Sequence, residues 1–169
     1  MTSALRKRCE KAAMTIALPY CDDVSPTLKG LRVVEAQVSI DKTLVRLQDA
    51  EGRVVWLSAV GDCCSNSWFE HIDGMAPPFT LTEEPEFDRW MEPKKEVRDW
   101  NNPDDSGKDV LKIYAIKFKT NRGRASLELR NASNGYYGGT VEVSEEQPID
   151  QYSRKIEKLP KMRPLVDDF

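Results

Sequence analysis

This sequence has a single histidine, no long apolar run and no excess of positive charge. His71 is the only histidine among 169 residues, which excludes a site built from several imidazoles. No apolar run approaches the roughly 20 residues that a membrane-spanning helix needs. The formal net charge is -3, whereas general nucleic-acid binding requires a sustained basic surface. We therefore expect a soluble, cytoplasmic protein that contacts neither nucleic acid nor membrane.

The sequence also lacks the spacings that announce a metal or nucleotide site. It has no glycine-rich phosphate loop and no catalytic-triad signature. The four cysteines stand at irregular intervals that fit neither a zinc ribbon nor a disulfide framework, at Cys9, Cys21, Cys63 and Cys64. We therefore predict reduced thiols, no metal and no cofactor.

A chain of 169 residues is long enough for one ordinary core. We divide it into an N-terminal helical extension (1–27), a core domain (28–145) and a charged C-terminal tail (146–169), which by default is a solvated end. The core carries an acidic insertion at about 83–109 that contains several prolines, Trp90 and Trp100. We expect this insertion to contribute to partner choice, and its removal over 84–105 to spare folding.

Most of the core shows the period of β-strands. Apolar and polar residues alternate between 30 and 60, with turns at 41–42 and 49–52, which predicts a three-stranded antiparallel meander. Further strands are predicted near 79–82, 110–120, 125–130 and 140–143, and 121–123 makes a hairpin turn. Short helices are predicted over about 5–16, from 68, within 87–100 and over 151–159. The predicted fold class is α+β, a single domain whose antiparallel sheet of about six strands packs with short helices.

The stretch GDCCSNSWFEHI, residues 61–72, gathers two adjacent thiols, the histidine and two large aromatic residues. Ser67 is followed three residues later by Glu70, the spacing of a capping box, so a helix is expected to begin near Trp68. Cys63 and Cys64 would then occupy a strand-to-helix turn, where backbone N–H groups favour negative charge.

That placement leaves several interpretations of the thiols open. A thiolate with a lowered pKa could act as a nucleophile, with His71 as its base. Alternatively, Cys63 and Cys64 are small packing residues at a tight corner, which is the interpretation we favour. A vicinal disulfide would be strained. A zinc site using both thiols and His71 lacks an evident fourth ligand.

A second stretch, NASNGYYGG at 131–139, combines a turn signal with two glycines that permit close backbone approach. Together the two stretches resemble a family of small proteins of unknown function found in bacteriophages and their bacterial hosts, over roughly 28–145. The resemblance implies a phage setting, the host cell cytoplasm, and a role in blocking or sequestering host defence.

We therefore hypothesise a small non-enzymatic binding protein that inhibits or sequesters a host component, with a host protein or a small ligand as partner. The alternative is a cysteine-dependent enzyme that uses Cys63 or Cys64 with His71. If the two motifs form one site, they should lie at the same end of the sheet, within side-chain reach. The candidate binding residues are Asp62, Cys63, Cys64, Ser65, Trp68, His71, Asn134, Tyr136 and Tyr137.

Overall fold

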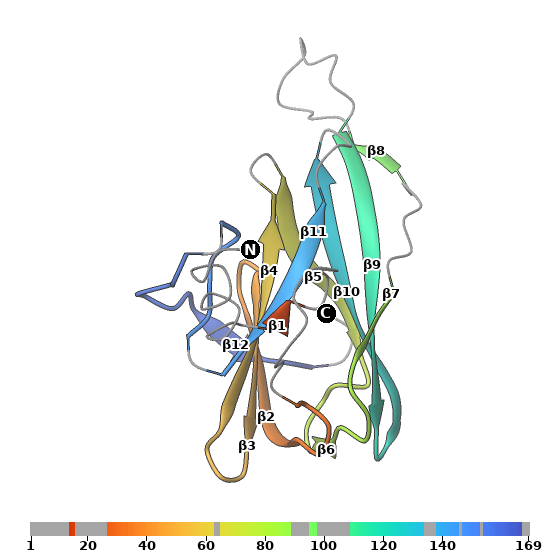
Figure 1. Ribbon diagram of the computed structural model, residues 1–169, viewed down its shortest axis with the longest axis vertical. Coiled ribbons are helices and arrows are strands. Elements are labelled where there is room, and N and C mark those ends of the chain that lie inside the picture. The colour runs from red at the N-terminus through yellow and green to blue at the C-terminus, as the bar shows by residue number, and fades with distance from the viewer. Residues whose placement is uncertain are drawn as a thin grey trace, which may run out of the picture.

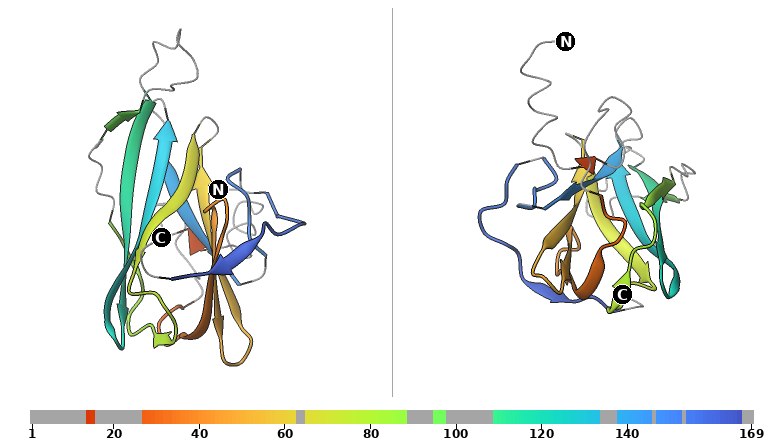
Figure 2. Two further views of the ribbon diagram at one scale, coloured as in Figure 1. Left: turned by 180° about the vertical axis from the view of Figure 1, so that it is seen from behind. Right: turned by 60° about the horizontal axis from the view of Figure 1, so that its bottom comes forward.

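The computed structural model describes residues 14–15, 27–62, 65–88, 95–97, 109–133, 138–145, 147–152 and 154–166. Over these residues the chain forms two antiparallel β-sheets and no helix. The sheets face each other as a sandwich (Figure 1; Figure 2). The predicted α+β class is therefore wrong, because the described fold is all-β. With no helix in these ranges, none is long and apolar enough to cross a membrane.

The first sheet, sheet A, has the strand order β1-β11-β4-β3-β2-β12, and β6 also pairs with β2. Its strands are β1 (Met14–Thr15), β2 (Arg32–Ser39), β3 (Leu44–Asp49), β4 (Val54–Gly61), β6 (Phe79–Thr80), β11 (Gly139–Ser144) and β12 (Met162–Pro164). The predicted meander over 30–60 is confirmed by β2, β3 and β4, which pair in chain order.

The second sheet, sheet B, has the order β5-β10-β9-β7, and β8 also pairs with β9. Its strands are β5 (Asn66–Asp73), β7 (Glu86–Asp88), β8 (Lys95–Val97), β9 (Asp109–Thr120) and β10 (Gly123–Ser133). The predicted hairpin is confirmed, since β9 and β10 pair without interruption from Gly123↔Thr120 to Ser133↔Val110.

The core lies between the sheets, and on β10 it takes alternate side chains. On β10 the inward positions 125, 127, 129, 131 and 133 are buried, whereas the positions between them are half-buried. The largest fully buried side chains come from both sheets and from the segments next to β2 and β6: Phe69, Phe79, Phe118, Leu28, Leu44, Leu47, Leu57, Ile72, Met75, Leu81, Ile116 and Leu127. This alternation is the pattern that antiparallel sheets with one buried face require.

The predicted helices are not found wherever the structure describes the chain. Met14–Thr15 is extended and pairs with β11. The stretch from 66 to 73 is strand β5, and parts of 87–100 form β7 and β8. Residues 151–152 and 154–159 form turns and one β-bridge. The remainder of the predicted N-terminal helix, together with Trp90 and Trp100, lies outside the described residues.

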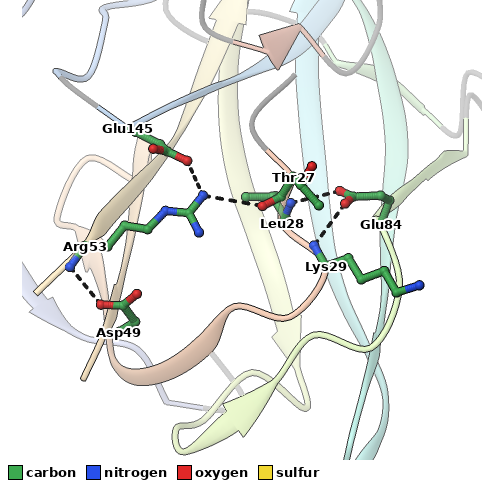
Figure 3. Close-up of polar contacts among 7 residues, drawn as sticks. All are labelled: Thr27, Leu28, Lys29, Asp49, Arg53, Glu84 and Glu145. Atoms are coloured by element: carbon green, nitrogen blue, oxygen red, sulfur yellow. Dashed lines mark hydrogen bonds and ion pairs between the residues drawn. The ribbon is translucent and has the colours of Figure 1, made fainter. Parts of the chain in front are cut away.

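The acidic segment is integrated into sheet B. β7 and β8 both pair with β9, and the Phe87 ring stacks on Tyr114 with centroids 5.6 Å apart. Both carboxylate oxygens of Glu84 accept backbone hydrogen bonds, from Leu28 N at 3.1 Å and Lys29 N at 3.0 Å (Figure 3). Deleting 84–105 would remove all of these contacts, so we no longer expect that deletion to spare folding.

The C-terminal segment is also packed against the sandwich and is not a solvated tail. β12 pairs with β2, and Leu165 is buried in the core while its backbone N–H donates to Ala36 O. On the same sheet, Arg53 hydrogen-bonds to Thr27 O at 3.4 Å and pairs with Glu145 (Figure 3). These contacts fix both ends of the domain onto sheet A.

Candidate functional site at the two sheet crossings

Each of the two sequence motifs lies at a place where the chain changes sheets. The first joins β4 of sheet A to β5 of sheet B, and the second joins β10 of sheet B to β11 of sheet A; these two connections are called the crossings below. Because β4 pairs with β11 and β5 pairs with β10, both crossings lie at the same end of the sandwich, the upper end in Figure 1.

Backbone and side-chain hydrogen bonds join the two crossings directly. Asp62 N donates to Gly138 O at 3.2 Å, and Gly138 N donates to Asp62 Oδ2 at 3.1 Å. The Ser65 hydroxyl lies 3.2 Å from both Asp62 O and Gly138 O. The expected proximity of the two motifs is therefore confirmed for their described residues; binding at this place remains a prediction.

Asn131 holds the crossings together from inside the sandwich. Its side chain is completely buried, and its Nδ2 donates to the hydroxyls of Ser65 and Ser67, each at 2.9 Å. The Ser67 hydroxyl in turn donates to Val60 O at 3.0 Å. These three hydrogen bonds link β4, β5 and β10 to one another from inside the sandwich.

Two glycines allow the chain segments to approach this closely. A Cβ on Gly61 would lie 2.8 Å from both the backbone oxygen and the hydroxyl of Ser65. A Cβ on Gly139 would lie 2.6 Å from the Ser67 hydroxyl and 3.0 Å from Asn131 Cβ. The shortest separation at each position, 2.8 Å for Gly61 and 2.6 Å for Gly139, is closer than a Cβ atom can approach, which explains why glycine occupies both positions.

Two buried polar atoms near the crossings have no hydrogen-bond partner within the described part of the chain. They are Asn131 Oδ1 and Thr140 Oγ1. An unsatisfied buried acceptor costs about 1–3 kcal/mol, so such groups usually have a functional or structural reason. Asn131 lies on β10 and Thr140 on β11, the two strands on either side of the second crossing.

On the outer face of sheet B, Trp68 belongs to a small ionic cluster. Its indole N–H donates to Glu70 at 3.1 Å, and the Lys42 ammonium contacts the same carboxylate at 2.6 Å. Burial raises the pKa of Glu70. The hydrogen bonds from Lys42 and Trp68, together with the charges of Lys42 and Arg130, lower that pKa by more than burial raises it. The net pKa lies below its usual value, so Glu70 is an anion at neutral pH.

This arrangement predicts an acid-sensitive contribution to stability. A carboxyl whose folded pKa is lowered stabilises the fold above its ordinary pKa of 4.5, and that stabilisation is lost as pH falls through the folded value. We expect Glu70→Gln to reduce the free energy of unfolding by about 0.5–1 kcal/mol at neutral pH. The deficit should shrink as pH falls below 4.5, in urea titrations compared with the exposed control Glu157→Gln. A deficit independent of pH would show that Glu70 acts only through packing.

His71 occupies a β-bulge and is exposed. The pairing of β5 with β10 shifts between Leu127 and Glu128, which leaves His71 without a partner across the ladder. Its φ is 44°, in the left-handed region that costs a non-glycine residue on the order of 1 kcal/mol or more. Strand β5 is extended at about 3.3 Å per residue, so His71 lies about 20 Å along the chain from Ser65. The helical geometry that would have brought His71 back to the thiols is absent.

Comparison with known proteins identifies the domain. A family described as a domain of unknown function, DUF7448, matches residues 27–143. The chain belongs to the DUF7448 family. No curated protein matches this DUF7448 chain. No solved structure matches it either.

Only part of the predicted site falls within the described portion of the DUF7448 domain. Asp62 and Ser65 meet Gly138, whereas Trp68 and His71 lie further along β5, away from the crossings. The others, Cys63, Cys64, Asn134, Tyr136 and Tyr137, lie outside the described residues. In the part of the domain that is described, no group of His, Cys, Asp and Glu side chains is arranged to hold a metal ion.

Sequence reasoning missed two residues that organise the crossings, Ser67 and Asn131, whereas the close backbone approach expected at Gly139 is confirmed. The sequence predicts a helix cap at Ser67, although Ser65, Ser67 and Phe69 show the period-two spacing of a strand with one buried face. Asn131 stands at an inward position of β10, and its polarity at the end of an apolar series was the available signal.

Proposed function

We propose that this DUF7448 chain is a small, phage-type, non-enzymatic binding protein that inhibits or sequesters a component of host defence. The observation that carries the proposal is the junction of the two sheet crossings at one end of a rigid sandwich. Asp62 and Ser65, which flank 63–64 in the sequence, belong to this hydrogen-bonded junction, and so does Gly138, which follows 134–137. Loops at one end of a β-sandwich are a common place for recognition, because the sheets position them while their sequences vary freely.

The geometry of β5 favours binding over cysteine chemistry. General-base catalysis needs His71 within hydrogen-bond reach, about 3 Å, of the attacking sulfur. His71 instead stands on an exposed bulge near the far end of an extended strand. The phage setting and the defence target are supported by the resemblance of the two motifs, and the host protein or small ligand would contact the two crossing segments.

A capture experiment with matched variants tests the proposal. Tagged protein is incubated with bacterial host lysate, and bound protein or small molecule is identified by mass spectrometry and then measured with purified components. We expect a stoichiometric partner whose affinity falls at least about tenfold, or about 1.4 kcal/mol, when Tyr136 and Tyr137 are both changed to alanine. Val34→Ala is the control, because Val34 is exposed on β2 and lies away from the crossings.

The same partner separates a binding protein from a cysteine enzyme. We expect Cys63→Ser and His71→Gln to retain capture, and iodoacetamide to label Cys63 and Cys64 slowly until the protein unfolds. Site-resolved peptide mapping is needed because Cys9 and Cys21 are also present. Rapid labelling at one of the paired thiols, with turnover of a captured molecule that is abolished in a folded His71→Gln variant, would overturn the proposal.

A further inference from the structure

A cavity of about 420 Å³ lies at the opposite end of sheet B from the crossings. It opens on the outer face of the sheet beside the β9–β10 turn, and its lining is dominated by charged residues. A volume of this size is in the range that holds a small molecule. The polar residues that line it include Asp73, Glu84, Glu86, Lys117, Arg124 and Ser126.

The register of the strands explains why these residues share one surface. Ser126 pairs with Asp73 on one side and with Lys117 on the other, and Lys117 pairs with Glu86. These positions therefore form one row across β5, β10, β9 and β7, with their side chains on the outer face. Arg124 lies two residues before Ser126 on β10 and so points to the same face.

Several charged residues in the cavity already have partners. The Lys119 ammonium pairs with Glu83 at 2.6 Å, and this hydrogen bond and charge raise the pKa of Lys119. Both oxygens of Glu84 accept backbone N–H groups (Figure 3). Lys117 stands directly opposite Glu86, at the spacing where opposite charges attract across a ladder.

Four polar side chains in the cavity make no side-chain hydrogen bond or ion pair within the described part of the chain: Asp73, Glu86, Arg124 and Ser126. Glu86 faces the charges of Lys117 and Lys119, so Asp73, Arg124 and Ser126 are the groups best placed for a ligand. Asp73 and Arg124 have opposite charge and occupy a diagonal on neighbouring strands, with the Ser126 hydroxyl beside them. A ligand that carries both a cation and an anion could satisfy both groups at once.

We propose that this cavity binds a small zwitterion with an ammonium and a carboxylate, that is, a free amino acid or a short peptide with free ends. The carboxylate lies against the Arg124 guanidinium, which can donate two parallel hydrogen bonds, and the ammonium lies against Asp73. Ser126 donates or accepts one further hydrogen bond between them. The site lies on the other side of the domain from the crossings and does not depend on their function.

The test uses trialanine as the probe and the full chain labelled for NMR. Free trialanine is expected to shift the backbone amide signals of β5, β9 and β10 around the cavity. N-acetyl-trialanine and trialanine amide, which each lack one charge, should bind at least about tenfold more weakly. The Asp73→Asn variant should bind trialanine and N-acetyl-trialanine with equal affinity, because the partner of the ammonium is gone. The Arg124→Gln variant should likewise bind trialanine and trialanine amide with equal affinity.

Arg32→Gln is the matched control for the cavity variants, since Arg32 is exposed on β2 in the other sheet and lies outside the cavity lining. It should bind trialanine as the unchanged protein does. The proposal is overturned if blocked and free peptides bind equally, or if no signal near the cavity moves at about 20 mM probe, a concentration well above a millimolar dissociation constant.

Discussion

Changing Gly139 to alanine is expected to lower the free energy of unfolding by about 2–4 kcal/mol, from overpacking together with a broken buried hydrogen bond. The new Cβ would lie 2.6 Å from the Ser67 hydroxyl and 3.0 Å from Asn131 Cβ. Both neighbours are buried and hydrogen-bonded to each other, so neither can move without breaking the contact that joins the crossings. Urea denaturation followed by tryptophan fluorescence measures the loss.

The adjacent glycine provides the control for this substitution. A Cβ on Gly138 would meet only the Tyr114 hydroxyl, at 3.2 Å, and that hydroxyl is the atom of the side chain farthest from its backbone. We expect Gly138→Ala to cost less than about 1 kcal/mol, as for a tight but adjustable contact. Equal losses at the two positions would mean that the Ser67–Asn131 contact does not limit the approach of β11.

Changing Gly74, at the other end of β5, to alanine is also expected to lower the free energy of unfolding by about 2–4 kcal/mol. Gly74 has a φ of 69°, which L-residues adopt only under strain. A Cβ there would also lie 2.9 Å from Arg124 O and 3.1 Å from Ala125 Cβ. A backbone oxygen cannot rotate away, so β5 would have to separate from β10.

Gly52→Ala separates the strain of a positive φ from the steric collision with a neighbouring strand. Gly52 also has a positive φ, 87°, but a Cβ on it would face open space. Its loss, about 1 kcal/mol, therefore measures the conformational strain alone. If thermal unfolding shows the same loss for Gly74→Ala as for Gly52→Ala, the predicted collision with Arg124 does not occur.

The sequence alone was sufficient to predict the regular hairpins. Strands β2, β3 and β4 are rich in apolar and β-branched residues and are separated by short turns, and Gly123 follows the β9–β10 turn with a φ of 126°. In such segments the local pattern and the tertiary structure agree. Local agreement of this kind makes strand positions readable without a structure.

A bulge hides the strand period of β5. Its inward residues are Ser67, Phe69 and Ile72, and the extra residue His71 lengthens the last interval from two positions to three. An interval of three also fits the helical period. The helix expected from Trp68 rested on the capping-box spacing of Ser67 and Glu70, but Glu70 binds Lys42, which is distant in sequence. Long-range contacts of this kind leave no local signature.

The candidate site could be located but not constructed from the sequence. The two motifs were correctly expected to lie together, because each combined a tight turn with polar groups. The network that joins them depends on Asn131, which lies more than 60 positions from Ser65 and Ser67. Such a pairing is decided by the register of β10 against β5 and cannot be inferred from either segment alone.

The position of β12 constrains how the domain is completed as it leaves the ribosome. β2 is made early, yet one of its edges is paired over Gln37–Ser39 by a strand that is made far later, and Leu165 enters the core at the same step. Until then, nascent chains carry an unpaired strand edge beside a gap in the apolar interior. Open edges of this kind promote association between chains, so the pairing of β12 with β2 covers an edge that would otherwise favour aggregation.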